Sequence, residues 1–89
     1  MGIKNNQMTK IKTFDDLEFF PHQVVKGGKH AFMKFPNGEW VSVVGGPGLY
    51  GNGETTFEVL TSQNEEEPFG YQSKEEVSKI MTDFQTPVI

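Results

Sequence analysis

Residues 46–51, Gly-Pro-Gly-Leu-Tyr-Gly, match the G-x-G-x-x-G pattern, in which glycines let a backbone approach a phosphate closely. In dinucleotide-binding domains these glycines open a helix whose N-terminal amides meet the pyrophosphate. Here the residues that follow, Thr55 to Leu60, include β-branched and aromatic side chains and predict a strand instead. A kinase-type loop would also need a strand lysine, a catalytic loop and a metal-binding aspartate, which the remaining sequence does not offer. The spacing therefore predicts a flexible connector between strands, and we expect no cofactor.

Few other side chains could do chemistry. The only histidines are His22 and His30, the chain has no cysteine, and neither histidine has a partner at a metal-ligand spacing. No serine lies in a G-x-S-x-G elbow, and Glu58 by itself does not make the carboxylate pair of a glycosidase. We therefore expect no metal, no catalytic residue and no enzymatic activity.

The charge is distributed unevenly along the 89 residues, whose formal net charge is −4. Residues 1–34 carry six lysines and three acidic residues, whereas residues 35–89 carry two lysines and nine acidic residues, and arginine is absent. Because phosphate affinity comes mainly from Lys and Arg, this balance disfavours nucleic-acid binding. No apolar run approaches the length of a membrane span, and no signal-peptide core precedes residue 10. Together with the absence of cysteine, this favours a cytoplasmic protein.

The central part of the chain predicts a small antiparallel meander. Two runs rich in apolar residues, 30–35 and 40–44, flank Pro36-Asn37-Gly38-Glu39, and a third run spans residues 55–60. If Asn37 and Gly38 form a two-residue type I′ turn, Phe35 pairs with Trp40. That register places one set of side chains on the core face and leaves Phe32, Lys34, Val41 and Val43 on the other; the core set is Ala31, Met33, Phe35, Trp40, Ser42 and Val44. Before the meander, residues 17–20 predict a short strand that Pro21 places at an edge of the sheet or ends.

The last element predicted is a helix. Ser73 and Glu76 fit a capping box, and Pro87 ends the pattern. One helix face collects apolar residues at a helical spacing, and Glu75 is placed to pair with Lys79; the apolar residues are Val77, Ile80, Met81 and Phe84. The fold class predicted is α+β, with an antiparallel sheet of three to four strands and the helix packed on one face. We expect a flexible lead-in over residues 1–13, one domain over 14–86 and a tail over 87–89.

Several short segments follow one another in a distinctive order: Leu17-Glu18-Phe19, Pro21-His22, Phe35-x-Asn37-Gly38, Ser42-Val43-Val44-x-Gly46, Tyr50-Gly51, Phe57-Glu58-Val59-Leu60 and Gly70-Tyr71-x-Ser73-x-Glu75-Glu76-Val77. Across about residues 14–84 this order resembles a family of small, functionally uncharacterised proteins of tailed bacteriophages. The resemblance implies a phage origin and expression in a bacterial host. It implies no catalytic or binding residue.

The function we expect is the binding and modulation of a host or phage protein by a small accessory protein. Leu49 and Tyr50, presented by the glycine-rich connection, are candidate contact residues, as are Glu65, Glu66 and Glu67. One alternative is a virion or assembly component that self-associates through a sheet edge, with the monomer or dimer state left open. Another is an acidic nucleic-acid mimic, in which phosphates are imitated by Glu54, Glu58, Glu65, Glu66 and Glu67.

Overall fold

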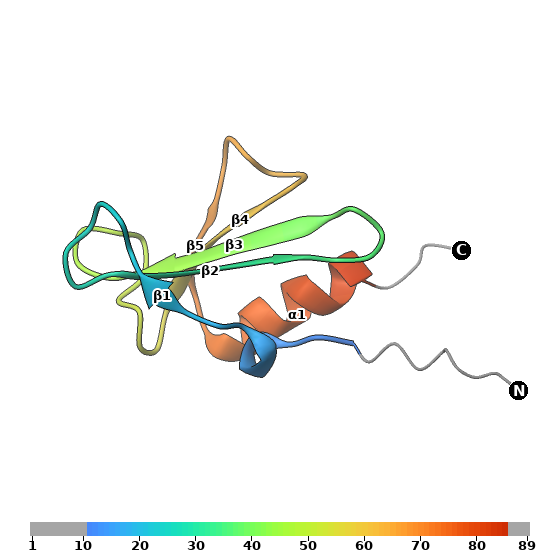
Figure 1. Cartoon of the computed structure of the whole chain (residues 1–89), viewed down its shortest axis with the longest axis horizontal. Helices are drawn as coiled ribbons and strands as arrows, with labels where there is room; N and C mark the ends of the chain where they lie inside the picture. Colours follow the sequence, from blue (N-terminus) through green and yellow to red (C-terminus); the bar gives the residue numbers. More distant parts are fainter. Residues whose placement is uncertain (1–10, 86–89) are drawn as a thin grey trace, which may run out of the picture.

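A computed structural model describes residues 11–85, which form an antiparallel sheet with one α-helix packed against it (Figure 1). The sheet has five strands in the order β1-β2-β3-β4-β5, so the α+β prediction is confirmed and the sheet is larger than the three to four strands expected. The elements are a 3-10 helix at Phe14–Asp16, β1 at Phe20–Pro21, β2 at Lys29–Lys34, β3 at Trp40–Gly45, β4 at Phe57–Thr61, β5 at Phe69–Gln72 and α1 at Lys74–Gln85. The predicted tail and all but the last residues of the predicted lead-in lie outside the described residues.

The turn between β2 and β3 differs from the predicted type I′ turn. Phe35 N donates to Glu39 O at 2.7 Å, and Gly38 N donates to Phe35 O at 2.9 Å, which leaves a three-residue loop. Gly38 has φ +92°, whereas Asn37 does not have a positive φ. Pro36 explains the difference, because its ring fixes φ near −65° at the first central position and so favours a type I turn followed by a left-handed glycine.

The extra loop residue shifts the register by one. Trp40 pairs with Lys34 instead of Phe35, and Val43 pairs with Ala31. The predicted core face was therefore right for β2 but wrong for β3. Val41 and Val43 are fully buried, whereas the side chains assigned to the core in their place, those of Trp40, Ser42 and Val44, point to the opposite face.

Helix α1 packs on one face of the sheet, as predicted, but that face is the one that carries Val41 and Val43 rather than Trp40. Its capping box is present, with Ser73 N donating to Glu76 Oε1 at 2.8 Å and Glu76 N donating to Ser73 Oγ at 3.1 Å. The predicted apolar stripe faces the sheet, and its fully buried members are Val77 and Met81. Lys79 pairs with Asp83 at 3.3 Å rather than with Glu75, so that detail of the prediction was wrong.

Residues 11–19 run beside α1 and complete the layer on this side of the sheet (Figure 1). Phe14 N donates to Ser78 Oγ at 3.0 Å, and the Phe14 ring lies 4.9 Å from the ring of Phe57. Of the strand predicted at residues 17–20, only Phe20 pairs with β2, and Pro21 pairs beside it. Phe19 instead packs against the core, because its ring fits beside those of Phe14 and Phe57. Pro21 lies at a sheet edge, as expected.

Candidate protein-binding face

The glycine-rich segment at 45–53 is a tight loop that folds back on the end of β3. Gly46 N donates to Gly51 O at 2.9 Å, which closes the loop. A side chain then organises its end, because Asn52 Oδ1 accepts from three successive backbone amides, those of Glu54, Thr55 and Thr56. A Cβ at Gly51 would lie 2.5 Å from Phe57 Cα, so the loop backbone also rests on β4. The segment is thus anchored at several points along its length.

The two candidate contact residues in this loop differ. Leu49 is half-buried, whereas Tyr50 is exposed and its ring lies 5.9 Å from the ring of Tyr71. Tyr50 O accepts from Tyr71 N at 2.9 Å, and Tyr50 N donates to Glu58 Oε1 at 3.1 Å. The backbone of Tyr71 has φ +56°, a left-handed conformation that is rare for an aromatic residue. It lies where the β4–β5 register shifts, next to Glu58. The structure therefore brings together an exposed tyrosine pair.

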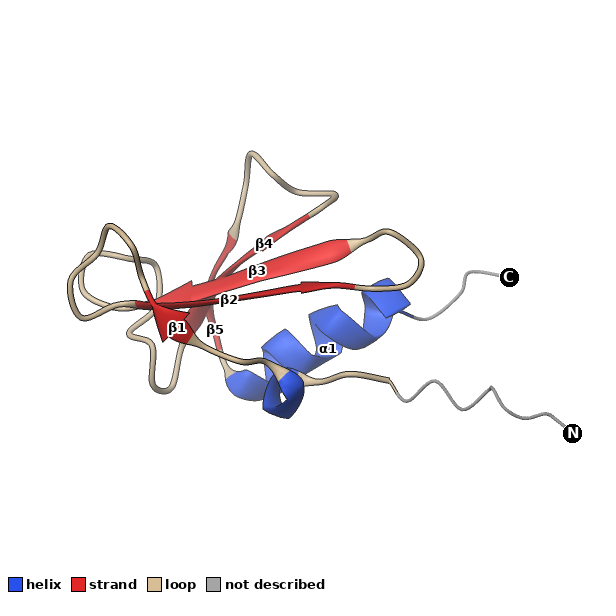
Figure 2. Cartoon of the chain, viewed as in Figure 1, coloured by secondary structure: helices blue, strands red, loops and turns tan. Residues whose placement is uncertain are grey.

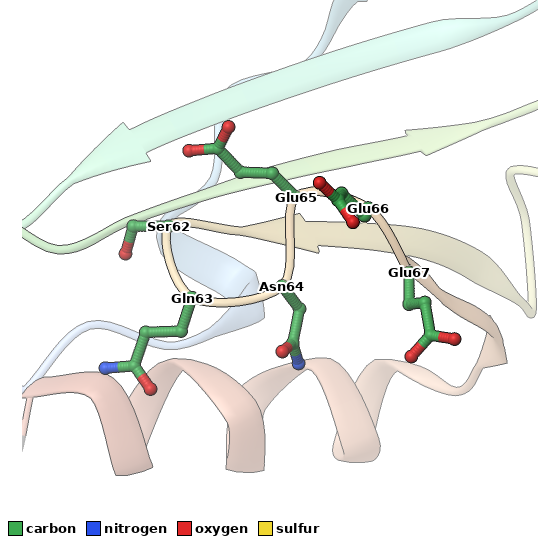
Figure 3. A pocket seen from close by; sticks show the side chains of 6 residues that line it. All are labelled: Ser62, Gln63, Asn64, Glu65, Glu66 and Glu67. Carbon is green, nitrogen blue, oxygen red and sulfur yellow. The ribbon is translucent and has the colours of Figure 1, made fainter.

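The three candidate glutamates lie on the loop between β4 and β5 and are all exposed. This loop, residues 62–67, surrounds an open hollow of about 540 Å³ (Figure 3). The figure shows the carboxylates of Glu65, Glu66 and Glu67 pointing in different directions, so they do not converge on one point. We call residues 62–67 the acidic loop.

Hydrogen bonds tie the acidic loop to the start of β3. Ser62 Oγ and Gln63 Nε2 donate to the carboxylate of Glu39, and Ser62 Oγ accepts from Trp40 N at 3.1 Å. The hydrogen bond from Ser62, and then that from Gln63, lower the pKa of Glu39 below its usual value, because both stabilise the ionised carboxylate. Glu39 therefore adds a negative charge beside the acidic loop at neutral pH.

The face of the sheet opposite α1 was missed as a candidate site. No helix or other strand among residues 11–85 packs over it, and only the turn at residues 22–24 borders its His30 end, whereas α1 and the N-terminal segment lie together on the other side (Figure 2). Cross-strand partners share a face, so the register fixes its members, which are Phe20, His30, Phe32, Lys34, Trp40, Ser42, Val44, Glu58 and Leu60. We call this set the uncovered face.

Aromatic side chains dominate one end of the uncovered face. Phe32 is 55% exposed, and its ring lies 5.6 Å from the ring of Trp40, the single tryptophan of the chain. Leu60 lies in the same row as Phe32, across β3. Lys34 flanks Trp40 on one side, and the first residue of the acidic loop, Ser62, flanks it on the other. The arrangement is an apolar centre between one lysine and a group of carboxylates.

His30 lies at the other end of this face, and His22 lies beside it in the turn before β2. His22 Nδ1 accepts from the amides of Val24 and Val25 and so organises the turn before β2. His30 Nε2 lies 3.1 Å from Ser42 Oγ, which is the spacing of a nucleophile and its base. A hydrolytic reaction at Ser42 would also need hydrogen-bond donors for an oxyanion. The backbone amides of β3 are used in pairing with β2 on one side and β4 on the other. Among the described residues, no three His, Asp or Glu side chains gather closely enough to hold a metal ion.

Comparison with known proteins adds no family to this description, because no family model, curated protein or solved structure matches the chain. Within residues 11–85, no helix has the length and hydropathy needed to cross a bilayer.

Proposed function

We propose that this chain is a non-enzymatic protein-binding domain that contacts its partner through the uncovered face. The observation that carries the proposal is the Phe32–Trp40 pair, in which Phe32 is exposed and Trp40 half-buried, in a sheet whose other face is fully used by the core. Aromatic anchors with a rigid support dominate the energies of protein interfaces. The uncovered face has that support, because the strands beneath it are held by the buried residues Val41, Val43 and Val59.

The sheet edges are less suited to binding, which argues against assembly through an edge. β1 has two residues and ends in Pro21, which has no amide to donate. β1 pairs only with Lys29 and His30, so the free part of the β2 edge is short, at residues 31–34. β5 has four residues, and its register with β4 is broken near Tyr71, whose left-handed backbone turns the edge away from regular pairing. Short and interrupted edges are how proteins avoid edge-to-edge association.

The positions of the acidic residues argue against a nucleic-acid mimic. Glu58 belongs to the uncovered face, whereas Glu54 lines a hollow with Lys29, Lys74 and Phe14 on the helix side of the sheet. A mimic of a phosphate backbone needs its carboxylates in one continuous row, and these two lie on opposite sides.

The resemblance to small bacteriophage proteins suggests where the partner would be met. In that setting the partner is a protein of the bacterial host or of the phage, met in the host cytoplasm, and binding modulates the partner.

Photo-crosslinking in bacterial cells tests the proposal. Benzoylphenylalanine would replace Phe32 in one variant and Ile11 in a control, because Ile11 is an exposed apolar residue outside the uncovered face. We expect a discrete protein adduct from position 32 and none from position 11. Absence of an adduct at position 32, or the same adducts from both positions, would contradict the proposed contact surface.

A further inference from the structure

We propose that the uncovered face receives an amphipathic helix of another protein, with an apolar stripe flanked by lysine and arginine. This inference rests on the proposed function and names the chemistry of the partner. The length of the partner helix can be estimated from this protein, because α1 already covers the opposite face of the same sheet. α1 has 12 residues and is therefore about 18 Å long, close to the length of about 20 Å expected for the six-residue strands β2 and β3. A second helix of that length would complete a three-layer arrangement.

A helix fits this face better than an extended peptide does. An added strand would need a free sheet edge, and both edges are short or interrupted, as described above. The centre of the uncovered face is instead a surface of side chains, in which Phe32, Trp40 and Leu60 lie in adjacent rows. Side chains of a helix at positions i, i+3, i+4 and i+7 can pack on such rows, as those of α1 do on the other side.

The charges around the uncovered face determine which charge the partner helix should carry. Glu39 and the acidic loop lie beside Trp40, and on the other side of Trp40 there is the single positive charge of Lys34. A helix with lysine or arginine beside its apolar stripe would place opposite charges against these carboxylates. A second copy of the chain is a poorer occupant, because it carries a net charge of −4 and would bring the same acidic loop.

The probe for this inference is a synthetic peptide of about 14 residues with leucines at i, i+3, i+4 and i+7 and lysines between them. Its control has glutamate in place of every lysine. Trp40 reports binding directly, because it is the only tryptophan and lies on the proposed surface. We expect the lysine peptide to change the Trp40 emission and the glutamate peptide to bind more weakly by about tenfold or more.

Two triple variants separate local charge from total charge. The first replaces the glutamates of the acidic loop, Glu65→Gln, Glu66→Gln and Glu67→Gln. The second makes the same change in net charge at exposed positions outside the acidic loop and the uncovered face, Glu18→Gln, Glu54→Gln and Glu75→Gln. We expect the first to weaken binding of the lysine peptide about tenfold, since three adjacent charge pairs are lost, and the second less than about twofold. Phe32→Ser should weaken binding about tenfold or more, because it removes an aromatic anchor.

Equal effects of the two triple variants would show that only the total charge matters and would overturn the inference. Sedimentation that shows a dimer which Phe32→Ser dissociates would also overturn it, because a second copy would then be the occupant. If position 32 crosslinks to a protein in cells but the lysine peptide is not preferred, the charge and helix argument fails while the proposed function stands. If neither crosslinking nor peptide binding is seen, both fail.

Discussion

The close contact between Gly45 and Gly53 makes a sharp test of how the glycine-rich loop is packed. An alanine at position 45 would place its Cβ 2.4 Å from Gly53 Cα and 2.6 Å from Gly53 N. Gly45 does not have a positive φ, so an alanine there meets no backbone strain of its own. The whole cost of Gly45→Ala is therefore steric, and the atoms that must move belong to the backbone of the loop.

The expected loss of stability in Gly45→Ala follows from the kind of atom that the new Cβ meets. Overpacking a well-packed site costs about 1–3 kcal/mol, and the upper end applies here because a backbone cannot rotate away as a side chain can. For a domain of this size about 3 kcal/mol lowers the melting temperature by about 12–24 °C. Gly48→Ala is the matched control, since Gly48 has φ +81° but no atom lies within 4 Å of its added Cβ. It should cost only about 1 kcal/mol for the left-handed backbone, or about 4–8 °C.

Thermal unfolding followed by circular dichroism, with urea unfolding as a second measurement, compares the two variants with the parent chain. If Gly45→Ala melts within a few degrees of the parent, or no lower than Gly48→Ala, the loop does not rest on the end of β3. The description of residues 45–53 as an anchored loop would then be wrong.

Three further outcomes follow from the structure, each measured by thermal unfolding. Met81→Ala should cost about 3 kcal/mol because Met81 is fully buried, whereas Phe84→Ala should cost less, about 2 kcal/mol, because Phe84 is half-buried; the reverse order would contradict the packing of α1. Tyr71→Asn should raise stability by up to about 1 kcal/mol, since asparagine adopts the left-handed conformation more readily, and a loss would show that the contact with Tyr50 outweighs the strain. The pKa of Glu39 is lowered from 4.5, so its hydrogen bonds stabilise the fold above that pH and this contribution is lost as the pH falls through the lowered pKa. Glu39→Gln should therefore make the melting temperature less dependent on pH below about 4.5, and an unchanged acid limb would refute the interaction.

Helix α1 was predictable from the sequence because everything that defines it is local. The capping box spans Ser73 to Glu76, and the apolar positions repeat every three or four residues. Only its ion pair was misassigned. Lys79 has an acidic residue four positions away in each direction, and the sequence alone does not say which of the two it approaches.

The register of the central hairpin was not predictable from Asn37-Gly38 alone. Pro36 fixes φ at the first central position of the turn, so the turn begins one residue before Asn37 and the loop has three residues instead of the expected two. Because side chains alternate along a strand, a shift of one residue moved Trp40 from the expected core to the uncovered face. The error in the turn was therefore also the reason that the candidate binding face was missed.

Alternation could not have corrected that error, because the central strands are apolar on both faces. β2 buries Ala31 on one face and exposes Phe32 on the other, and β3 buries Val41 while it presents Trp40. Strands with apolar side chains on both faces are expected where both faces of a sheet are covered. In residues 11–85 only the α1 side is covered, so no contact within this part of the chain explains the apolar side chains on the uncovered face. The feature that made the register ambiguous is thus the same feature that favours a partner on the uncovered face.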